Sequence, residues 1–421
     1  MAHNRCQQTV PEILKREADR EFDYYLAACT GCGVCSLACH VSQSHRESEF
    51  LPAYRIELLR RVYRQVWAPV GWLSAAPRRA GEQAAELIEK LFTAAYTCTG
   101  CRRCMVYCPF GVDLSWVVGV GKAALAALGR VPEELELLTE TAVEKGNSVH
   151  LYRGLLQELI GQLEPELRRL TGLPGATIPM GKKGARVMFV ALEGIERLIL
   201  PSAIFNLAGE DWTLSEYEAS NFGYFLGDCG RASRIARRIV EEAKALGVEQ
   251  VVVDECGHAY RVMKHLYPKW TGGELPFEVK SVVELWDSYL REGRIKVDRG
   301  GIKEPTTYHD PCQLGRNGGI FEAPRAVVKA VARDFREMNP NREKNWCCGG
   351  GGGLVALAEL EQFRAEAGRM KAEQIRATGA KLVVTPCGNC RIQLGLINQY
   401  YGLGIEVASI ADLLMQSVIR D

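Results

Sequence analysis

The sequence predicts an α+β protein of several domains: a mostly helical N-terminal domain that binds two metal clusters, followed by two tandem α/β domains. Three observations predict this architecture. Two identical four-cysteine runs lie near the N-terminus, helical and β-branched apolar stretches alternate in the rest of the chain, and that alternating part contains an internal duplication. The expected boundaries are residues 1–180 for the helical domain, 181–300 for the first α/β domain and 301–421 for the second.

Composition and charge narrow the class of protein. A chain of 421 residues with 47% hydrophobic and 24% charged residues has ordinary globular composition. Its 52 basic and 51 acidic residues balance, which argues against nucleic acid as the main partner because phosphate binding needs a basic surplus. No window of about 18 apolar residues is free of charge. We therefore expect no membrane span, and contact with a membrane only through a partner.

Cysteine is the residue type that stands out, with sixteen in the chain. That many cysteines either pair in an oxidising compartment or hold metal in a reducing one. The first residues are not followed by the apolar run of a signal peptide, and disulfide scaffolds are usually short chains. The sequence therefore favours metal binding in the cytoplasm, with the inner membrane surface reached through a partner subunit.

The two N-terminal runs share the spacing C-x2-C-x2-C-x3-C, which is that of bacterial ferredoxins. Three closely spaced thiolates can reach three irons of one cubane, whereas the fourth starts a helix that leads to the other cluster. One 4Fe–4S cubane would be held by Cys29, Cys32, Cys35 and Cys108, and the second by Cys98, Cys101, Cys104 and Cys39. Two zinc sites are the alternative, but zinc ligands usually come as separated C-x2-C pairs. His40 stands where Pro109 follows the second run.

Helices are predicted around these runs. Ile56–Val62 and Ala84–Phe92 are amphipathic at helical spacing, with prolines between them. The helical pattern resumes at Leu114 and continues to about Leu173, where a linker rich in Gly and Pro begins.

The internal duplication has an offset near 130 residues: Gly247–Gly257 resembles Gly379–Gly388, and Glu278–Leu285 resembles Glu406–Leu413. Short apolar runs alternate with helical stretches in both copies, which predicts buried parallel strands. The predicted strands are Arg186–Val190, Val251–Val253 and Leu382–Val384, and helices are expected at Arg234–Leu246 and Leu360–Thr378. A Cys-Gly pair follows a strand in each copy, at the edge where open α/β sheets bind ligands.

The second copy carries five cysteines in the pattern C-x34-C-C-G-x37-C-x2-C: Cys312, Cys347, Cys348, Cys387 and Cys390. With its flanking residues Tyr308–Pro311 and Thr385–Pro386, this pattern resembles the CCG, or cysteine-rich, domain of the heterodisulfide reductase family. Gln313 is a departure, because family members often have His there. The whole layout is similar to the fused catalytic subunit of heterodisulfide reductase. It is also similar to the iron–sulfur subunits of glycolate, lactate and anaerobic glycerol-3-phosphate dehydrogenases.

The resemblance implies that these five cysteines hold a third 4Fe–4S cluster of non-cubane type. An ordinary cubane with one free cysteine stays open, as does a nucleotide loop at Gly349–Gly353, although that run lacks the G-x-G-x-x-G form. The first copy keeps only Cys229 and Cys256, so we expect it to be structural and without a cluster. A zinc site that combines them with His258 or Asp228 is the alternative. Cys6 has no partner motif.

No flavin or dinucleotide fingerprint is found, so hydride chemistry is assigned to another chain and no flavin is expected on this one. The resemblance implies an oxidoreductase subunit in a hetero-oligomeric complex. Electrons from a flavin- or quinone-linked partner subunit would pass the two cubanes and reach the third cluster, which would reduce a small-molecule disulfide. His309 or Asp310 would deliver protons to the thiolate products, although His309 is equally readily explained as a structural residue.

The alternative function is an electron relay without disulfide chemistry. The chain would then serve a flavin-linked 2-hydroxy acid or glycerol-3-phosphate dehydrogenase, or a bifurcating or acyl-CoA-reducing complex. A third class, a metal-binding scaffold without redox activity, would contain almost no iron.

Overall fold

The computed structural model describes residues 20–67, 77–148, 153–192 and 197–420. The chain forms two compact units, each built from several segments. The first unit consists of residues 1–136, 223–230 and 346–371, and the second of residues 137–222, 231–345 and 372–421. The expected mixture of helix and parallel sheet is confirmed. The domain boundaries near residues 180 and 300 stay predictions.

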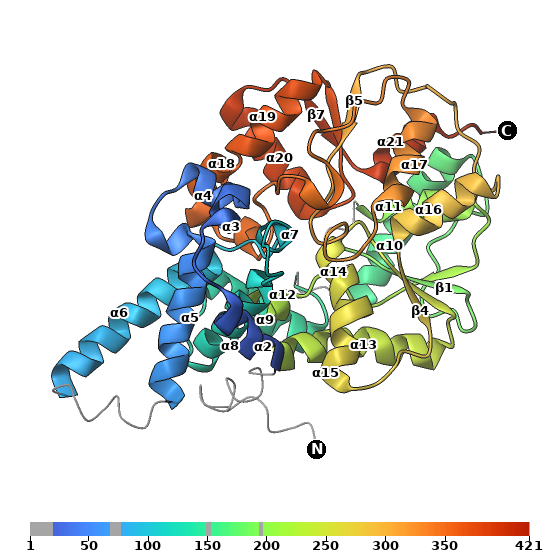
Figure 1. The fold of residues 1–421 in the computed structure, drawn as a ribbon. Coiled ribbons are helices and arrows are strands. Elements are labelled where there is room, and N and C mark those ends of the chain that lie inside the picture. Colours follow the sequence, from blue (N-terminus) through green and yellow to red (C-terminus); the bar gives the residue numbers. More distant parts are fainter. Residues whose placement is uncertain (1–19, 68–76, 149–152, 193–196, 421) are drawn as a thin grey trace. The chain divides into compact units, whose positions relative to one another are not determined.

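The described part of the first unit is helical. Its principal elements are α2 (Arg20–Ala28), α3 (Val34–Ala38), α4 (His40–Ser44), α5 (Pro52–Trp67), α6 (Pro77–Tyr96), α7 (Arg103–Val106), α8 (Leu114–Ala127) and α18 (Glu361–Ala367). Both helices predicted between the cysteine runs are confirmed as parts of α5 and α6. These two helices pack on each other and on α8, as Figure 1 shows in blue and teal. The close approach depends on Gly121, where a Cβ would meet methyl groups of Leu59 and Leu91 at 3.3 and 3.4 Å.

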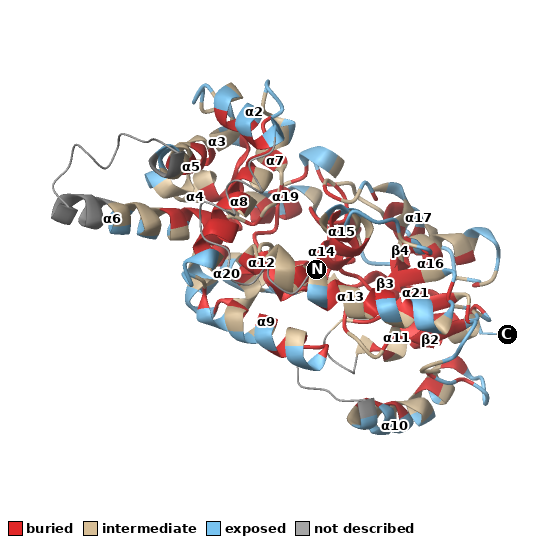
Figure 2. Cartoon of the chain, turned by 90° about the horizontal axis from the view of Figure 1, so that it is seen from below, coloured by how far each residue is buried: buried red, intermediate tan, exposed pale blue. Residues whose placement is uncertain are grey.

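The second unit contains two parallel sheets. The larger has the strand order β2-β1-β3-β4 and the smaller the order β5-β6-β7. The strands are β1 (Val187–Val190), β2 (Trp212–Leu214), β3 (Gln250–Val253), β4 (Glu278–Ser281), β5 (Thr306–Tyr308), β6 (Leu382–Val384) and β7 (Glu406–Ala408). All are parallel, and β1 and β3 are largely buried; Figure 2 shows β3 in red. The predicted buried parallel strands are therefore confirmed.

Helices precede, connect and follow the strands of both sheets. They include α10 (Arg153–Thr171), α11 (Ile199–Leu207), α13 (Cys229–Leu246), α14 (Gly257–Arg261), α15 (Tyr267–Thr271), α16 (Val282–Arg291), α17 (Glu322–Val331), α19 (Arg369–Thr378), α20 (Gly388–Tyr401) and α21 (Ile410–Ser417). The helical stretch expected at 360–378 is interrupted at Gly368, between α18 and α19. Among the described residues, no helix combines the length and the apolar character needed to cross a bilayer.

The two sheets repeat one arrangement, with β1-β3-β4 corresponding to β5-β6-β7. Cys256 follows β3 as the N-cap of α14, and Cys387 follows β6 as the N-cap of α20. The last strand of each sheet leads into a helix that a serine caps with a reciprocal capping box: Ser281 with Glu284, and Ser409 with Asp412. The duplication seen in the sequence thus recurs in the order of strands and in the local caps.

Candidate metal centres

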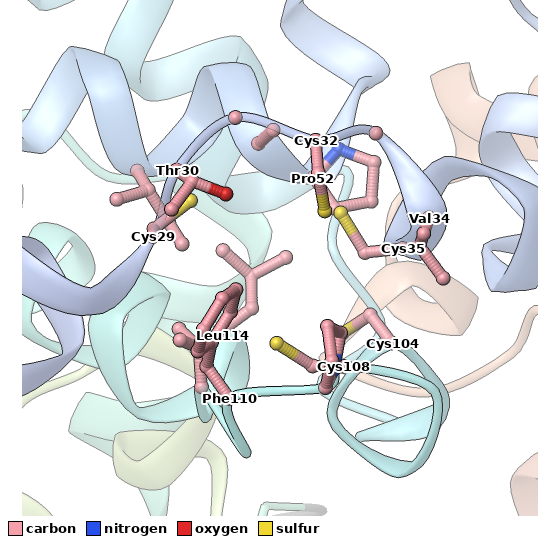
Figure 3. Close-up of a pocket in the computed structure, with 16 residues that line it drawn as sticks. Cys29, Thr30, Cys32, Val34, Cys35, Pro52, Cys104, Cys108, Phe110 and Leu114 are labelled. Carbon is pink, nitrogen blue, oxygen red and sulfur yellow. The ribbon is translucent and has the colours of Figure 1, made fainter.

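One pocket of the first unit is lined by the four cysteines predicted to hold the first cubane, together with Cys104 of the other set. Cys29, Cys32 and Cys35 come from the loop between α2 and α3 and from the start of α3, and Cys108 comes from the loop after α7. Figure 3 shows these sulfur atoms directed toward the same hollow, beside Phe110 and Leu114. Gly31 and Gly33 have φ values of 72° and 82°, a left-handed conformation that glycine adopts readily. The structure thus brings together the four cysteines assigned from spacing to one cubane.

A second pocket of the same unit is lined by Cys39, Cys98, Cys101 and Cys104. Cys39 is the N-cap of α4 and comes from the first run, whereas the other three come from the second. This pocket therefore gathers the second predicted set, including the exchanged fourth cysteine. His40 and Arg55 also line it.

Burial, and after it the crowding of the sulfur atoms, raises the pKa of cysteines in both pockets. Burial, followed by the charge of Cys29, raises the pKa of Cys35 to about 11. Burial and the charge of Cys101 likewise raise the pKa of Cys104 well above its usual value. Four thiolates in one pocket repel one another. A bound metal ion offsets their negative charge, and the thiols that coordinate it lose their protons. The fifteen described cysteines form no disulfide. Both donor sets therefore fit an iron–sulfur cluster, and the ligand assignments stay predictions.

The Cys347–Cys348 pair also belongs to the first unit, where its segment packs on the second ferredoxin run. The Cys347 thiol donates to Thr99 Oγ1 at 3.6 Å, and the Arg103 guanidinium lies 3.4 Å from the centre of the Trp346 ring. A Cβ at Gly351 would come within 2.8 Å of the Thr99 carbonyl oxygen. The buried Lys122 ammonium, on α8, donates to the carbonyl oxygen of Gly352 at 3.2 Å. Several independent contacts thus fix the cysteine pair beside residues 98–104.

Backbone N–H groups of the glycine run point at the two sulfur atoms. Gly349 donates to Cys347 Sγ and Gly350 to Cys348 Sγ, each at 3.4 Å. Successive N–H groups directed at one place stabilise an anionic centre. This geometry agrees with the role expected for the run in holding a thiolate-bound cluster.

The other three cysteines of the predicted third set lie in the second unit. Cys312 follows β5 in a loop, and the Asn317 amide donates to its carbonyl oxygen at 3.1 Å. Cys387 and Cys390 lie at the start of α20. A hydrogen bond from the Cys390 thiol is the main cause that lowers the pKa of Cys387 to about 7. These three cysteines are buried. They follow the carboxyl ends of parallel strands, which is the edge of a sheet where ligands bind.

His309 and Asp310 lie between β5 and Cys312 and have different surroundings. Asp310 accepts two 2.6 Å hydrogen bonds from Arg325 and one of 2.8 Å from the backbone N–H of Arg342. The Asn345 amide nitrogen lies 3.4 Å from Nδ1 of His309, and a neutral ring that accepts this hydrogen bond carries its proton on Nε2. A ring nitrogen of His309 lies within 4.8 Å of Cys390 Sγ. His309 is therefore the better placed of the two predicted proton donors, and Asp310 is held as a structural ion pair.

Sequence reasoning combined Cys256 with His258 only in the zinc alternative and missed the proximity of Cys256 to Cys387. The sulfur of Cys256 lies 3.1 Å from Nδ1 of His258, and Nε2 of His258 accepts a hydrogen bond from the Asn221 N–H at 3.3 Å. The N–H of Gly257 donates to the Cys387 thiol, and burial together with the charge of Cys387 raises the pKa of Cys256. A side chain at Gly257 would collide with the backbone of Leu314, two residues after Cys312.

Cys256 thus lies next to the residues predicted to bind the third cluster, although it belongs to the copy expected to be only structural. The correspondence between Cys256-Gly257 and Cys387-Gly388 was the available signal. Cys229 starts α13 in a segment of the first unit, and the zinc alternative stays a prediction. Cys6 lies outside the described residues.

Two family models match the chain. Residues 25–112 match the 4Fe-4S dicluster domain, and residues 306–395 match the cysteine-rich domain known as CCG. The first match contains all eight ferredoxin-type cysteines, and the second contains the five cysteines of the third set. The chain is therefore an iron–sulfur protein that combines a 4Fe-4S dicluster domain with a cysteine-rich CCG domain, and it is similar to heterodisulfide reductase-like iron–sulfur subunits.

Curated relatives resemble most of the chain. It is 29% identical to the Hdr-like menaquinol oxidoreductase iron–sulfur subunit 2 of Archaeoglobus fulgidus, over 96% of this chain and 81% of the relative. It is 28% identical to a subunit of the dihydromethanophenazine:CoB–CoM heterodisulfide reductase of Methanosarcina acetivorans, over 93% of this chain and 94% of the relative. It is 25% identical to the EtfAB:quinone oxidoreductase of Syntrophomonas wolfei, over 70% of this chain and 42% of that protein. Oxidoreductase subunits are thus the proteins that this chain resembles.

Proposed function

We propose that the chain is the iron–sulfur electron-transfer subunit of a heterodisulfide reductase-like complex, and that it carries single electrons between a partner subunit and a centre in its CCG domain. Iron–sulfur clusters supply one-electron chemistry when they are bound in such pockets. The chain's own residues contribute thirteen candidate thiolates, a dry setting for most of them, and backbone N–H groups at the Cys347–Cys348 pair.

One observation carries this proposal. The segment of Cys347 packs on the second ferredoxin run through Thr99, Arg103 and Lys122. A candidate ligand of the third cluster is thereby held against the pocket of the second cubane. Such proximity suits transfer of electrons between two centres and has no purpose in two independent zinc sites.

For the terminal step we propose reduction of a small-molecule disulfide at the centre of Cys312, Cys347, Cys348, Cys387 and Cys390. The overall change takes up two electrons and two protons and converts one disulfide into two thiols. His309 is the proposed proton donor, and the Asp310–Arg325 ion pair fixes the backbone that carries it.

The test uses the full chain, purified without oxygen and reduced with a viologen. We expect oxidation of the viologen when a heterodisulfide is added, together with a paramagnetic signal of the third cluster that depends on that substrate. If neither occurs while the clusters are fully loaded, the proposal of disulfide reduction is wrong.

A second candidate function is relay to a quinone- or flavin-linked partner without disulfide chemistry. It is favoured by the similarity to two relatives, a menaquinol oxidoreductase subunit and an EtfAB:quinone oxidoreductase. A loaded chain that is inert toward disulfides but is reoxidised by a quinone in the presence of its partner would establish this function. In either case we propose a cytoplasmic location, at the inner membrane surface when the partner is a membrane protein.

A further inference from the structure

His40 is a buried side chain to which the described part of the chain offers no hydrogen-bond partner. It is only 2% exposed, and among the described residues neither of its ring nitrogens has a hydrogen-bond partner. Burying a polar ring without partners costs free energy, so such groups in proteins usually meet a ligand, an ion or water. The position is distinctive in sequence as well, since the second ferredoxin run has Pro109 at the equivalent place.

The surroundings of His40 indicate what that partner is. The residue follows Cys39 directly and lines the pocket of Cys39, Cys98, Cys101 and Cys104. One ring nitrogen, Cys101 Sγ and Cys347 Sγ all lie within 4.8 Å of one another. All three residues belong to the first unit. The imidazole therefore lies close to a predicted ligand of the second cubane and to a predicted ligand of the third cluster.

We propose that His40 is a positioning residue for electron transfer between these two centres: its N–H donates a hydrogen bond to sulfur of the cluster in the second pocket, and its ring fixes the spacing between Cys101 and Cys347. This inference rests on the proposed function, because it requires the second cluster to be bound. The electron moves without making or breaking a covalent bond, and the ring keeps its proton throughout.

The expected consequence is a higher reduction potential for the second cubane. Hydrogen bonds to cluster sulfur favour the reduced form, which carries more negative charge. Loss of one hydrogen bond of ordinary strength changes the ratio of reduced to oxidised cluster about fivefold at a fixed potential. For a one-electron couple this ratio corresponds to a fall of about 40 mV.

The experiment is an anaerobic redox titration of the full chain, followed by electron paramagnetic resonance. Three variants are compared with the wild type: His40→Pro, which copies the second run, His40→Phe, which keeps a ring without an N–H, and His40→Gln, which keeps an N–H. The signal of the second cubane is identified as the one lost in Cys101→Ser. His45→Gln is the matched control. His45 is the C-cap of α4, the helix that His40 begins, but its ring stacks on Phe363 with 4.4 Å between ring centres, and it is not among the residues that line the pocket of the second cubane.

We expect the Pro and Phe variants to lower the reduction potential of the second cubane by about 40 mV. The potential of the Gln variant should stay near that of the wild type. The first cubane and the control are expected to be unchanged. If the Pro variant does not fold, the comparison of Phe with Gln decides. Equal potentials in Phe, Gln and wild-type chains of equal iron content would overturn the inference. A wild-type chain without a second cubane signal would instead overturn the proposed function.

Discussion

The sulfur atoms of Cys101 and Cys347 lie within 4.8 Å of each other, although one belongs to the second ferredoxin run and the other to the CCG pattern far along the chain. The contact lies inside one compact unit, because residues 346–371 fold with the N-terminal helices. A cysteine of the predicted third cluster is thereby built into the same unit as the two predicted cubanes. The following predictions test this arrangement and the elements that hold it.

If the two runs exchange their fourth cysteine, substitutions in different runs should alter the paramagnetic signal of the same cubane. Cys108→Ser and Cys32→Ser should alter the same cubane signal, because both sulfur atoms line one pocket. Cys39→Ser and Cys98→Ser should alter the other signal, because they line the second pocket. Electron paramagnetic resonance of the reduced chains is the measurement. If Cys108→Ser instead acts like Cys98→Ser, each run holds its own cluster and the exchange is wrong.

Gly352 should be intolerant of a side chain. It has a φ of 70°, and an added Cβ would collide with the carbonyl oxygen of Cys98. We expect Gly352→Ala to lower the free energy of unfolding by about 2–4 kcal/mol, from left-handed strain together with overpacking. Gly129→Ala is the matched control, since its φ of 66° is similar and nothing lies within 4 Å of the added atom. Equal losses in the two variants would show that the segment of Cys347 is not packed on the second run.

Removing one partner of the Asp310–Arg325 ion pair should be costly, because both side chains are almost completely buried, with exposures of 3% and 1%. Arg325→Met leaves the Asp310 carboxylate without its partner, which should cost about 3–5 kcal/mol. Denaturant unfolding without oxygen measures the loss. Arg169→Met provides the comparison, because the Arg169–Glu166 pair is exposed and should contribute little. A loss no larger than that of Arg169→Met would remove the argument that this pair fixes His309.

Local patterns made much of this site predictable. The ferredoxin spacing requires three sulfur atoms on one tight loop, so the pockets of Cys29 and Cys98 could be anticipated from the sequence. The strands at 251–253 and 382–384 were equally clear, because buried parallel strands are short continuous apolar runs. The placement of Cys256 beside Cys387 depends on how two copies of a duplication pack, and spacing within one copy carries no information on such contacts.

The environment of His40 could not be predicted from the sequence either. Its neighbours Cys101 and Cys347 come from segments whose proximity follows only from the packing of residues 346–353 on residues 98–104. Strand β2 was not predicted either, since three residues give too short a pattern to separate from a loop.

His258 predicts a pH dependence of stability. Burial lowers the pKa of His258 to about 4, compared with about 6.5 for an exposed imidazole. Between these values the unfolded chain binds a proton that the folded chain excludes, so stability is present above pH 6.5 and is lost as the pH falls toward 4. From pH 7 to pH 5 this one group should cost about 2 kcal/mol.

The matching experiment compares anaerobic denaturant unfolding of the wild type and His258→Gln at pH 7 and pH 5. The variant should lose about 2 kcal/mol less than the wild type over this range. Parallel pH profiles would show that the folded chain protonates His258 as readily as the unfolded chain does, and would contradict the prediction.

The central claim is that thirteen of the sixteen cysteines hold three iron–sulfur clusters in one chain. Iron and sulfide analysis of the anaerobically purified chain, combined with electron paramagnetic resonance, tests it most directly. The account predicts about twelve irons and a similar amount of sulfide per chain, with two cubane signals and a third signal of different type. An iron content near zero, or zinc in place of iron, would contradict it.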